Sequence, residues 1–429
     1  MPSLRGWATV ALGIGLWTLG RGFGAGGLEQ VGFALIALVG LAVMLVSARR
    51  HDLKVSRSLA PPRARAGQPV RVHLKIENEG RGSAPLLMME DTLPVELSGQ
   101  ARFALNGVEP GGSRDAEYEV SAPRRGRYEI GPLQTSIVDP FGLARTRGVA
   151  AEVDPLLVYP RIERLALPRE LGQQRSMSVS ALKQLSGARG EDFYTIREYA
   201  QGDDLRKIHW PSTAKRAKPM IRQEETPWHT RATILLDDRF SAHEGHGDGS
   251  SFERAVEGAA SLADLYHRSG YTYRLTTAHQ QGHATSRGTD HYRRILDQLA
   301  VLQPGHDTPD HDSLVLRLAE MESGMAAEGT LACVTGELSV EVAIGITRCR
   351  RRFRQVAVII YPGHRFGGAT TKSRWDGEQQ TRQSVTLLTR SGVPSLVLGP
   401  GEGLGAAWSS LSASGRRGGD AWARKPELA

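Results

Sequence analysis

The sequence predicts a multidomain protein, with an N-terminal transmembrane helical hairpin, a β-sandwich and a doubly wound α/β domain. Three observations support this fold class. Two apolar runs near the start flank a glycine-rich break, short alternating segments follow, and strand-like runs after residue 231 are separated by stretches long enough for helices. We therefore expect a hairpin over residues 1–48, a sandwich over 49–160, a charged and aromatic segment over 161–230, an α/β domain over 231–412 and a flexible tail over 413–429.

The hairpin is predicted from residues 7–19 and 31–46, which are apolar, the second run without a charge. The second run approaches the ~20 residues that cross a bilayer. A secretory signal peptide is the alternative for the first run, but a second apolar segment follows it where a polar mature start would be expected. We expect membrane lipid to contact residues 7–47, and four glycines to let the helices approach closely: Gly13, Gly15, Gly32 and Gly40.

The charges that flank the two runs predict the orientation in the membrane, because basic residues cluster on the cytoplasmic side. The loop between the runs holds Arg21 and Glu29, whereas five basic residues follow the second run: Arg49, Arg50, His51, Lys54 and Arg57. We therefore expect two helices in the plasma membrane and cytoplasmic soluble domains. A reducing compartment also fits a chain with two cysteines, Cys333 and Cys349.

The residues from about 54 to 160 form short runs broken by Gly, Pro or Asn, at spacings typical of an immunoglobulin-like or fibronectin-like sandwich. One run alternates strictly between apolar and polar residues. Because successive side chains of a strand point to opposite faces, its apolar residues are predicted to face the core: Val70, Val72, Leu74 and Ile76.

The α/β domain places candidate ligand residues at the ends of its strands, where open parallel sheets bind ligands. Asp237 and Asp238 end the first predicted strand and Ser241 follows, where a von Willebrand factor A-like domain carries its Asp-x-Ser-x-Ser metal motif. Arg239 stands at the first serine position, and Thr-Gly-Glu replaces the usual Thr-Asp-Gly after the third strand. We expect the acids to cap the next loop or to pair with Arg239, and the alternative is a Mg²⁺ or Mn²⁺ site.

Three further groups of residues resemble sites without completing one. The stretch 305–313 mixes histidines and aspartates, and we expect a solvated loop in which Asp312 or Ser313 caps the next helix. His243, His246 and Asp248 are expected to lie in a flexible loop. The glycines of 399–405 lack the Lys-Ser or Lys-Thr of a phosphate cradle and are attributed to helix capping and a loose tail.

No catalytic constellation is complete in the sequence. It contains neither a G-x-S-x-G elbow nor a cysteine beside a histidine. The net charge is +8, but no Arg-rich arm, zinc-ligand pattern or aromatic-basic stacking motif accompanies it, so nucleic acid is not expected as a partner. We expect no catalytic residues, no bound metal and no cofactor, and the sequence leaves the oligomeric state open.

The most specific stretch covers residues 190–224, in which acids and bases alternate with aromatic and aliphatic residues. Its adjacent acids are expected to pair with nearby arginines rather than to perform acid–base chemistry. We expect a structural and docking element at the junction of the two soluble domains. Twelve residues carry it: Gly190, Asp192, Phe193, Arg197, Glu198, Tyr199, Gly202, Asp203, Asp204, Arg206, Trp210 and Lys215.

Together with RGRYEIGP, VDPFGL and VYPRI upstream, this stretch resembles the bacterial family known as domain of unknown function 58. One departure is His209, where members often carry Asp. The resemblance implies a protein of the bacterial inner membrane that partners MoxR-type AAA+ ATPases and has a von Willebrand factor A-like C-terminal part. We therefore expect a non-enzymatic adaptor or scaffold in protein-complex maturation or cell-envelope processes. The alternative is a divalent-metal-dependent hydrolase or transferase that uses Asp237.

Overall fold

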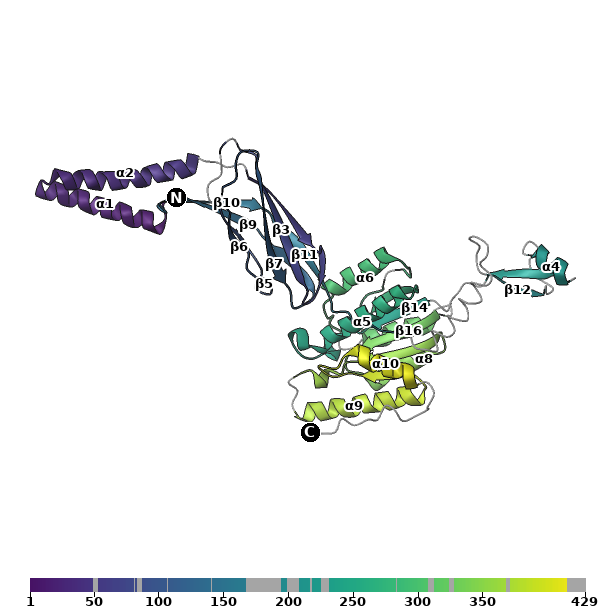
Figure 1. The fold of residues 1–429 in the computed structure, drawn as a ribbon. Helices are drawn as coiled ribbons and strands as arrows, with labels where there is room; N and C mark the ends of the chain where they lie inside the picture. Colours follow the sequence, from purple (N-terminus) through teal and green to yellow (C-terminus); the bar gives the residue numbers. More distant parts are fainter. Residues whose placement is uncertain are drawn as a thin grey trace. The chain divides into compact units, whose positions relative to one another are not determined.

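The computed structural model describes residues 1–48, 53–80, 82, 87–105, 107–139, 141–166, 194–198, 208–216, 218–224, 231–282, 284–307, 312–323, 328–367 and 371–414. The chain divides into two compact units, Met1–Arg161 and Ile162–Ala429 (Figure 1). The first unit contains a pair of helices and a β domain, and the second contains a small β-hairpin and an α/β domain.

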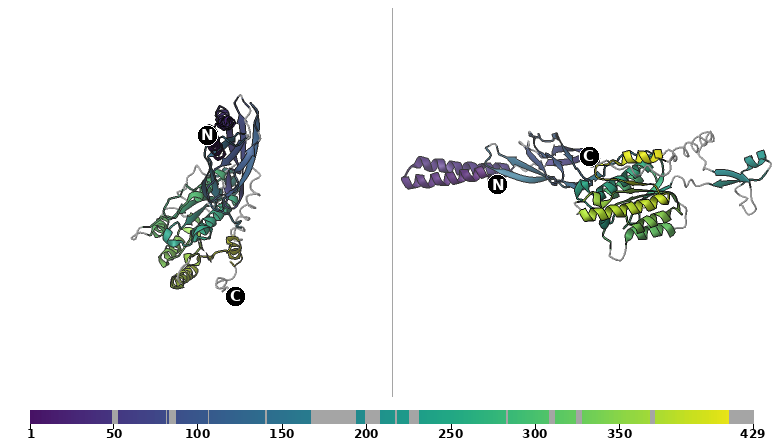
Figure 2. Two further views of the ribbon diagram at one scale, coloured as in Figure 1. Left: turned by 90° about the vertical axis from the view of Figure 1, so that its left-hand side faces the viewer. Right: turned by 90° about the horizontal axis from the view of Figure 1, so that it is seen from below.

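The first unit begins with two helices, α1 (Leu4–Phe23) and α2 (Gly26–Ala48), which lie side by side (Figures 1 and 2). The side chain of Ser3 caps α1 by accepting a hydrogen bond from Gly6 N at 3.0 Å. Gly24, at φ +67°, ends the helix in the left-handed region, which glycine adopts without a Cβ penalty. The predicted pair of helices with a glycine-rich turn is thus present.

Two of the four predicted contact glycines lie between the helices, and two do not. A Cβ on Gly13 would lie 2.9 Å from the carbonyl oxygen of Gly32, and a Cβ on Gly32 would lie 2.6 Å from that of Gly13. Open space surrounds Gly15 and Gly40, so the prediction for them is wrong. Gly15 is two residues beyond Gly13, about 200° around the helix, and therefore faces away from the partner helix.

Among the described helices, α2 is the one that is long and apolar enough to cross a membrane, since Gly26–Met44 has a mean hydropathy of 1.9. Helix α1 carries Arg5 and Arg21 near its two ends and contains five glycines, which lower its hydropathy. One candidate span is therefore found near the N-terminus, and a second span in α1 stays a prediction.

The β domain consists of two four-stranded sheets, in the orders β1-β3-β7-β5 and β10-β9-β4-β6, and a three-stranded sheet, β2-β11-β8. The bounds are β1 (Leu53–Ala60), β2 (Arg63–Arg65), β3 (Pro69–Asn78), β4 (Leu87–Asp91), β5 (Ser98–Gly99), β6 (Arg102–Leu105), β7 (Ser113–Ser121), β8 (Gly126–Ile130), β9 (Leu133–Val138), β10 (Arg145–Ala151) and β11 (Asp154–Tyr159).

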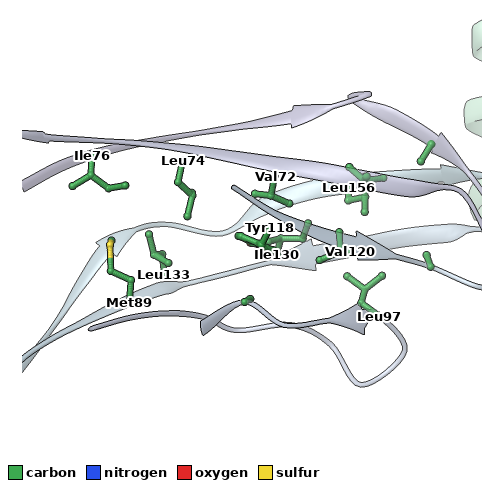
Figure 3. Packing of buried hydrophobic residues seen from close by; sticks show 14 of the residues in the cluster. Val72, Leu74, Ile76, Met89, Leu97, Tyr118, Val120, Ile130, Leu133 and Leu156 are labelled. Carbon is green, nitrogen blue, oxygen red and sulfur yellow. The ribbon is translucent and has the colours of Figure 1, made fainter. Parts of the chain in front are cut away.

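All three sheets contribute to one hydrophobic core. The predicted alternation of β3 is confirmed, because Val70, Val72, Leu74 and Ile76 are buried whereas the residues between them are exposed or partly exposed. Figure 3 shows Ile76 and Leu74 of β3 across from Met89 of β4 and Leu133 of β9. Side chains from facing sheets thus interdigitate, as in other two-layered β domains.

The Arg57 side chain is buried in the interior of the β domain, where it pairs with acidic residues. Its guanidinium is 1% exposed and donates to Asp91 at 2.8 Å and to Asp154 at 2.6 Å. Tyr118 also donates a hydrogen bond to Asp91. The Arg57 side chain is therefore paired inside the β domain, and its contribution to membrane orientation stays a prediction.

The second unit contains an antiparallel pair of strands, β12 (Tyr194–Glu198) and β13 (Met220–Glu224), from the segment predicted to be family-defining. The short helix α4 (Trp210–Arg216) lies between them in the chain. His209 N donates to Met220 O at 2.8 Å, and Met220 N donates to the Thr213 hydroxyl at 2.9 Å, so α4 is tied to β13. The described part of this segment therefore forms a strand pair and a short helix.

The α/β domain contains a five-stranded parallel sheet in the order β15-β14-β16-β17-β18. The strands are β14 (Arg231–Leu236), β15 (Thr272–Thr277), β16 (Glu328–Thr335), β17 (Phe353–Ile360) and β18 (Ser395–Val397). The helices are η3 (Phe240–Ala242), η4 (Gly247–Gly249), α5 (Ser251–Arg268), α6 (Thr289–Val301), α7 (Ser313–Ser323), α8 (Val340–Cys349), η5 (Gly363–Arg365), α9 (Thr371–Arg390) and α10 (Leu404–Ser414). The start of α9 and the whole of α10 were not predicted, because their polar or small residues lack a strong apolar period.

The strand order makes this a doubly wound sheet with one switch point. The chain runs from β14 through α5 to β15 in one direction and from β16 through α8 to β17 in the other. Right-handed crossovers then place α5 and α8 on opposite faces. Burial of the five consecutive residues Ala232–Leu236 of β14 agrees with a sheet covered on both faces. Ligand sites of such sheets lie where the loops diverge, here after β14 and β16.

Candidate functional site

The loops after β14 and β16 bring Asp237, Arg239 and Thr335 together in the interior. The Asp237 side chain is 0% exposed. Arg239 Nε donates to Asp237 Oδ1 and Arg239 Nη2 donates to Oδ2, both at 2.8 Å. The Thr335 hydroxyl donates to Oδ2 at 2.8 Å. The predicted pairing of the acid with Arg239 is thus confirmed, and both carboxylate oxygens have partners.

The ionisation of this pair follows from its surroundings. Burial acts to raise the pKa of Asp237, but the hydrogen bonds and charge of Arg239 outweigh burial and hold that pKa below its usual value. Burial likewise acts to lower the pKa of Arg239, and Asp237 reverses that effect and raises it. Asp237 and Arg239 therefore stay charged at neutral pH, as a bidentate pair inside the protein.

Arg239 has a third contact, which links the end of β14 to helix α7. Its Nη1 donates to Asp312 Oδ2 at 2.6 Å. The other oxygen of Asp312 accepts from the amides of Leu314 and Val315, both at 3.0 Å, and so caps α7. The predicted capping role of Asp312 is confirmed, and one guanidinium joins two loops of the sheet edge.

Asp238 points to a different neighbour, His279, which follows β15. Asp238 Oδ1 lies 2.9 Å from His279 Nδ1 and accepts from His279 N at 3.1 Å. His279 Nε2 lies 3.1 Å from Asp307 Oδ1 and 3.5 Å from the Ser313 hydroxyl. The order Asp, His, Ser is that of a catalytic triad, but Asp307 is nearer to Nε2 than Ser313 is, so the imidazole is held by two carboxylates. This arrangement fixes the loop positions rather than activating Ser313.

His243 is also part of the interior, so the expectation of a flexible loop is wrong for it. Its Nε2 lies 2.8 Å from Asp237 O, and its Nδ1 lies 3.1 Å from the Ser251 hydroxyl at the start of α5. Burial lowers the pKa of His243, although the nearby Asp237 acts in the opposite direction. The imidazole is therefore neutral at pH 7 and joins the β14 loop to α5.

The end of β16 is fixed by contacts that the sequence motif did not reveal. No side chain fits at Gly336, because a Cβ there would overlap the carbonyl oxygen of Ala242. Glu337 N donates to the same Ala242 oxygen at 2.6 Å. The Glu337 carboxylate lies 3.0 Å from His364 Nδ1 and accepts from the Thr381 hydroxyl at 3.2 Å. Glu337 therefore connects β16 to η5 and α9 instead of facing Asp237.

The three weak metal candidates are not brought to one point. Asp237 is paired with Arg239, Asp238 with His279, and Ser241 is exposed on η3. Across the described ranges, no group of three or more His, Cys, Asp or Glu side chains has the arrangement of a metal site. A divalent cation would have to displace a guanidinium that is already bound to both oxygens of a buried carboxylate.

The residues of the predicted docking element are partly outside the described residues. Those outside are Gly190, Asp192, Phe193, Tyr199, Gly202, Asp203, Asp204 and Arg206. In β12, Arg197 pairs with Ile221 of β13 and Glu198 pairs with Met220. Trp210 and Lys215 are both exposed on α4, Trp210 by 70%.

Sequence reasoning missed His279, Asp307, His364 and Thr381 as members of the sheet-edge network. Two of them were predictable, because His279 comes two residues after β15 and His364 four residues after β17, at the carboxyl ends of parallel strands. The contacts of Asp307 and Thr381 depend on how α7 and α9 pack, which is not a local property of the chain.

The comparisons with known proteins concern this same region. Residues 195–362, from β12 to the residues just after β17, match the family described as "Protein of unknown function DUF58". The resemblance to domain of unknown function 58 is confirmed. The chain is 22% identical over 319 residues to the uncharacterized protein YeaD of Bacillus subtilis strain 168, and the match covers 72% of this chain and 77% of YeaD. The DUF58 match includes Asp237, Arg239 and Thr335.

Two solved structures resemble parts of the chain more distantly. The CARDB domain of the PF1109 protein from Pyrococcus furiosus is 12% identical, with 25% of this chain and 88% of that domain covered and a TM-score of 0.19. A protein of unknown function from Porphyromonas gingivalis W83 is 20% identical, with 25% of this chain and 47% of that protein covered and a TM-score of 0.18. Scores this low carry no argument about either fold or function.

Proposed function

We propose that this protein is a membrane-anchored, non-enzymatic adaptor whose soluble part binds a MoxR-type AAA+ ATPase at the bacterial inner membrane. The anchor would be the pair α1 and α2, both as membrane spans. Support comes from apolar side chains exposed on both helices, among them Trp7 (61%), Leu19 (51%), Phe33 (68%) and Met44 (61%). Soluble proteins usually bury apolar side chains of this size, whereas a membrane-spanning helix exposes them to lipid.

The observation that carries the adaptor role is the exposure of Trp210 in the DUF58-matched segment. Trp210 lies on α4, a helix with no buried residues that also presents Lys215 and Arg216 to solvent. Tryptophan and arginine are the residues that most often dominate protein–protein interfaces. An exposed tryptophan on a short helix that also carries two exposed cations therefore supports a binding surface for the ATPase.

The geometry of the sheet edge supports binding rather than catalysis. Its acids are each paired with a cation or a histidine, and the pairs connect neighbouring loops. We also propose that the α/β domain is von Willebrand factor A-like and that Arg239 takes the position of the metal in such domains. A fixed guanidinium would stabilise the loops without making their shape depend on the concentration of a divalent cation.

Co-purification tests the adaptor proposal. The full-length protein is extracted in detergent and mixed with the MoxR-type ATPase of the same organism, and the bound ATPase is quantified. We expect Trp210→Ala to weaken binding by at least about tenfold, the loss that a tryptophan at an interface produces. Trp375→Ala is the matched control, because Trp375 is 63% exposed on α9 outside the matched residues.

Equal binding by the wild type and both variants would exclude α4 as the contact, and failure of the wild type to bind would exclude the partner. Loss of binding in Trp375→Ala but not in Trp210→Ala would place the interface on the α/β domain. Amide exchange of β13 separates a lost contact from a lost fold, since β13 is tied to α4 through Thr213.

A further inference from the structure

The end of the helical pair is bound to one loop of the β domain, between β9 and β10. We call Asp139 and residues 141–145 the hairpin-base loop. Ser3 N donates to Leu143 O at 2.8 Å, and the Ser3 hydroxyl donates to Gly142 O at 2.5 Å. Leu143 and Ala144 are buried against α2 in one small core, which contains Val39, Ala42 and Val46. The loop and the helices therefore form one packed structure rather than two parts joined by a flexible linker.

The conformation of the hairpin-base loop is fixed from inside by Asp139. Asp139 is 8% exposed. Its carboxylate accepts hydrogen bonds from the amides of Phe141 at 3.0 Å, Leu143 at 2.8 Å and Ala144 at 2.9 Å. Gly142, at φ +71°, supplies the left-handed turn. Because three amides converge on one carboxylate, the side chain of Phe141 is held in an outward position.

Aromatic and basic side chains gather at this end of the helices. Phe141 is 68% exposed despite its rigid backbone, and Trp7, in the first turn of α1, is 61% exposed. Arg5 lies beside the loop, because a Cβ on Gly142 would be 3.8 Å from Arg5 Nη1. Arg145 ends the loop and is exposed, and like Arg5 it has no ion pair with another described residue.

Arg147, two residues after Arg145 in β10, is also exposed. We propose that the hairpin-base loop lies in the headgroup layer of the membrane, with Phe141 at the edge of the acyl region and Arg5, Arg145 and Arg147 bound to anionic lipid headgroups. The proposal rests on the membrane anchorage of α1 and α2 proposed above. The loop adds an exposed aromatic side chain at the end of two helices that expose apolar side chains. An aromatic belt with adjacent cations is the composition found where proteins cross the membrane surface. Lipid is therefore the occupant that fits both the apolar and the charged side chains.

Lipid contact at the hairpin-base loop would also position the β domain. Since Ser3 and the small core fix the loop to α1 and α2, lipid bound to the loop would hold the β domain at one height above the membrane. A flexible tether would instead allow it a wide range of distances.

A lipid-quenching experiment on the full-length protein tests the inference. Single Phe141→Cys, Leu41→Cys and Val95→Cys variants are labelled with an environment-sensitive fluorophore and reconstituted in phosphatidylcholine, with or without phosphatidylglycerol. The natural Cys333 and Cys349 are buried, and burial raises the pKa of the Cys333 thiol, so labelling is directed to the new cysteine. Nitroxide-labelled lipids then report which positions touch the bilayer.

Leu41 and Val95 are the two reference positions. Leu41 is 49% exposed on α2 and reports membrane insertion of the helices. Val95 is 100% exposed. It lies at the end of the β domain that is far from α2, because the nearby Ser98 pairs with Ser121 at that end of β7. Labels at 41 and 141 are expected to be quenched severalfold more than the label at 95.

A variant that lacks the basic side chains tests whether the loop binds anionic headgroups. Phosphatidylglycerol is expected to increase the quenching at position 141. Arg5→Gln, Arg145→Gln and Arg147→Gln combined should abolish that increase without changing quenching in phosphatidylcholine. Quenching at 41 with a solvent-like signal at 141 would overturn the inference and leave the anchor intact. A solvent-like signal at 41 would overturn both. Quenching at 141 that does not depend on phosphatidylglycerol would overturn the binding of anionic headgroups.

Discussion

Replacing Arg239 by Met tests whether the guanidinium stabilises the edge of the parallel sheet. The substitution keeps an unbranched side chain of similar length but removes the charge and the bonds to Asp237 at 2.8 Å and to Asp312 at 2.6 Å. Asp237 is 0% exposed, so its carboxylate would be left buried with Thr335 as its remaining side-chain donor. Breaking a buried pair by removing one partner costs about 3–5 kcal/mol.

Amide hydrogen exchange of the full-length protein in detergent measures this cost where it arises. The chain has several domains, so a single unfolding transition would not report on one of them. The expected loss of ~3–5 kcal/mol corresponds to exchange of β14 and β16 that is faster by a factor of about 10² to a few times 10³. Peptides from the β domain should not change.

Arg293→Met is the matched control, since Arg293 pairs with Asp290 at 3.5 Å with side chains that are 57% and 90% exposed. Such a surface pair contributes about 0–1 kcal/mol. Acidification should reduce the difference between wild type and Arg239→Met, because the unpaired Asp237 of the variant has a raised pKa and becomes neutral first. Equal effects of the two substitutions, or a difference that does not change with pH, would refute the proposed role of the pair.

Three further predictions concern other parts of the chain. Arg57→Met should destabilise the β domain by about 3–5 kcal/mol, because it leaves buried Asp91 without its cation, and exchange of β3 and β4 measures the loss. Gly32→Leu should separate α1 from α2, lowering cysteine cross-linking between the helices, whereas Gly40→Leu should not, because open space surrounds Gly40. Burial lowers the pKa of His243, so the unfolded state takes up the proton first as the pH falls. The stability of the α/β domain should therefore decrease as the pH drops below about 6.5. His243→Gln should flatten that dependence by up to about 1.4 kcal/mol per pH unit.

The element types of the fold were predictable because they depend on local periodicity. The alternation of Val70 to Ile76 predicted β3 with the correct face inward. Apolar runs separated by helical stretches predicted the parallel sheet, and the position of Asp237 after the first of them predicted the pairing with Arg239, two residues away. Both inferences use residues that are close together in the chain.

The parts that failed depend on contacts between distant residues. The sequence did not reveal that Arg57 pairs with Asp91, 34 positions away, inside the β domain. His243 was placed in a flexible loop because of its glycine neighbours, yet it binds Ser251 at the start of α5. The prediction of helix contact was wrong for Gly15 and Gly40, because composition does not specify which face of a helix meets its partner.

The sequence by itself determined where most of the strands and helices form, the apolar character of the N-terminal runs and the DUF58 motif, since each depends on residues a few positions apart. The tertiary structure decided which charges are partners and which are free. Thr335 reaches Asp237 across 98 positions, and Ser3 reaches Gly142 across 139. Such pairs form only when strands from distant segments are placed side by side, because an ion pair or hydrogen bond depends on distances of about 3 Å that no local pattern specifies.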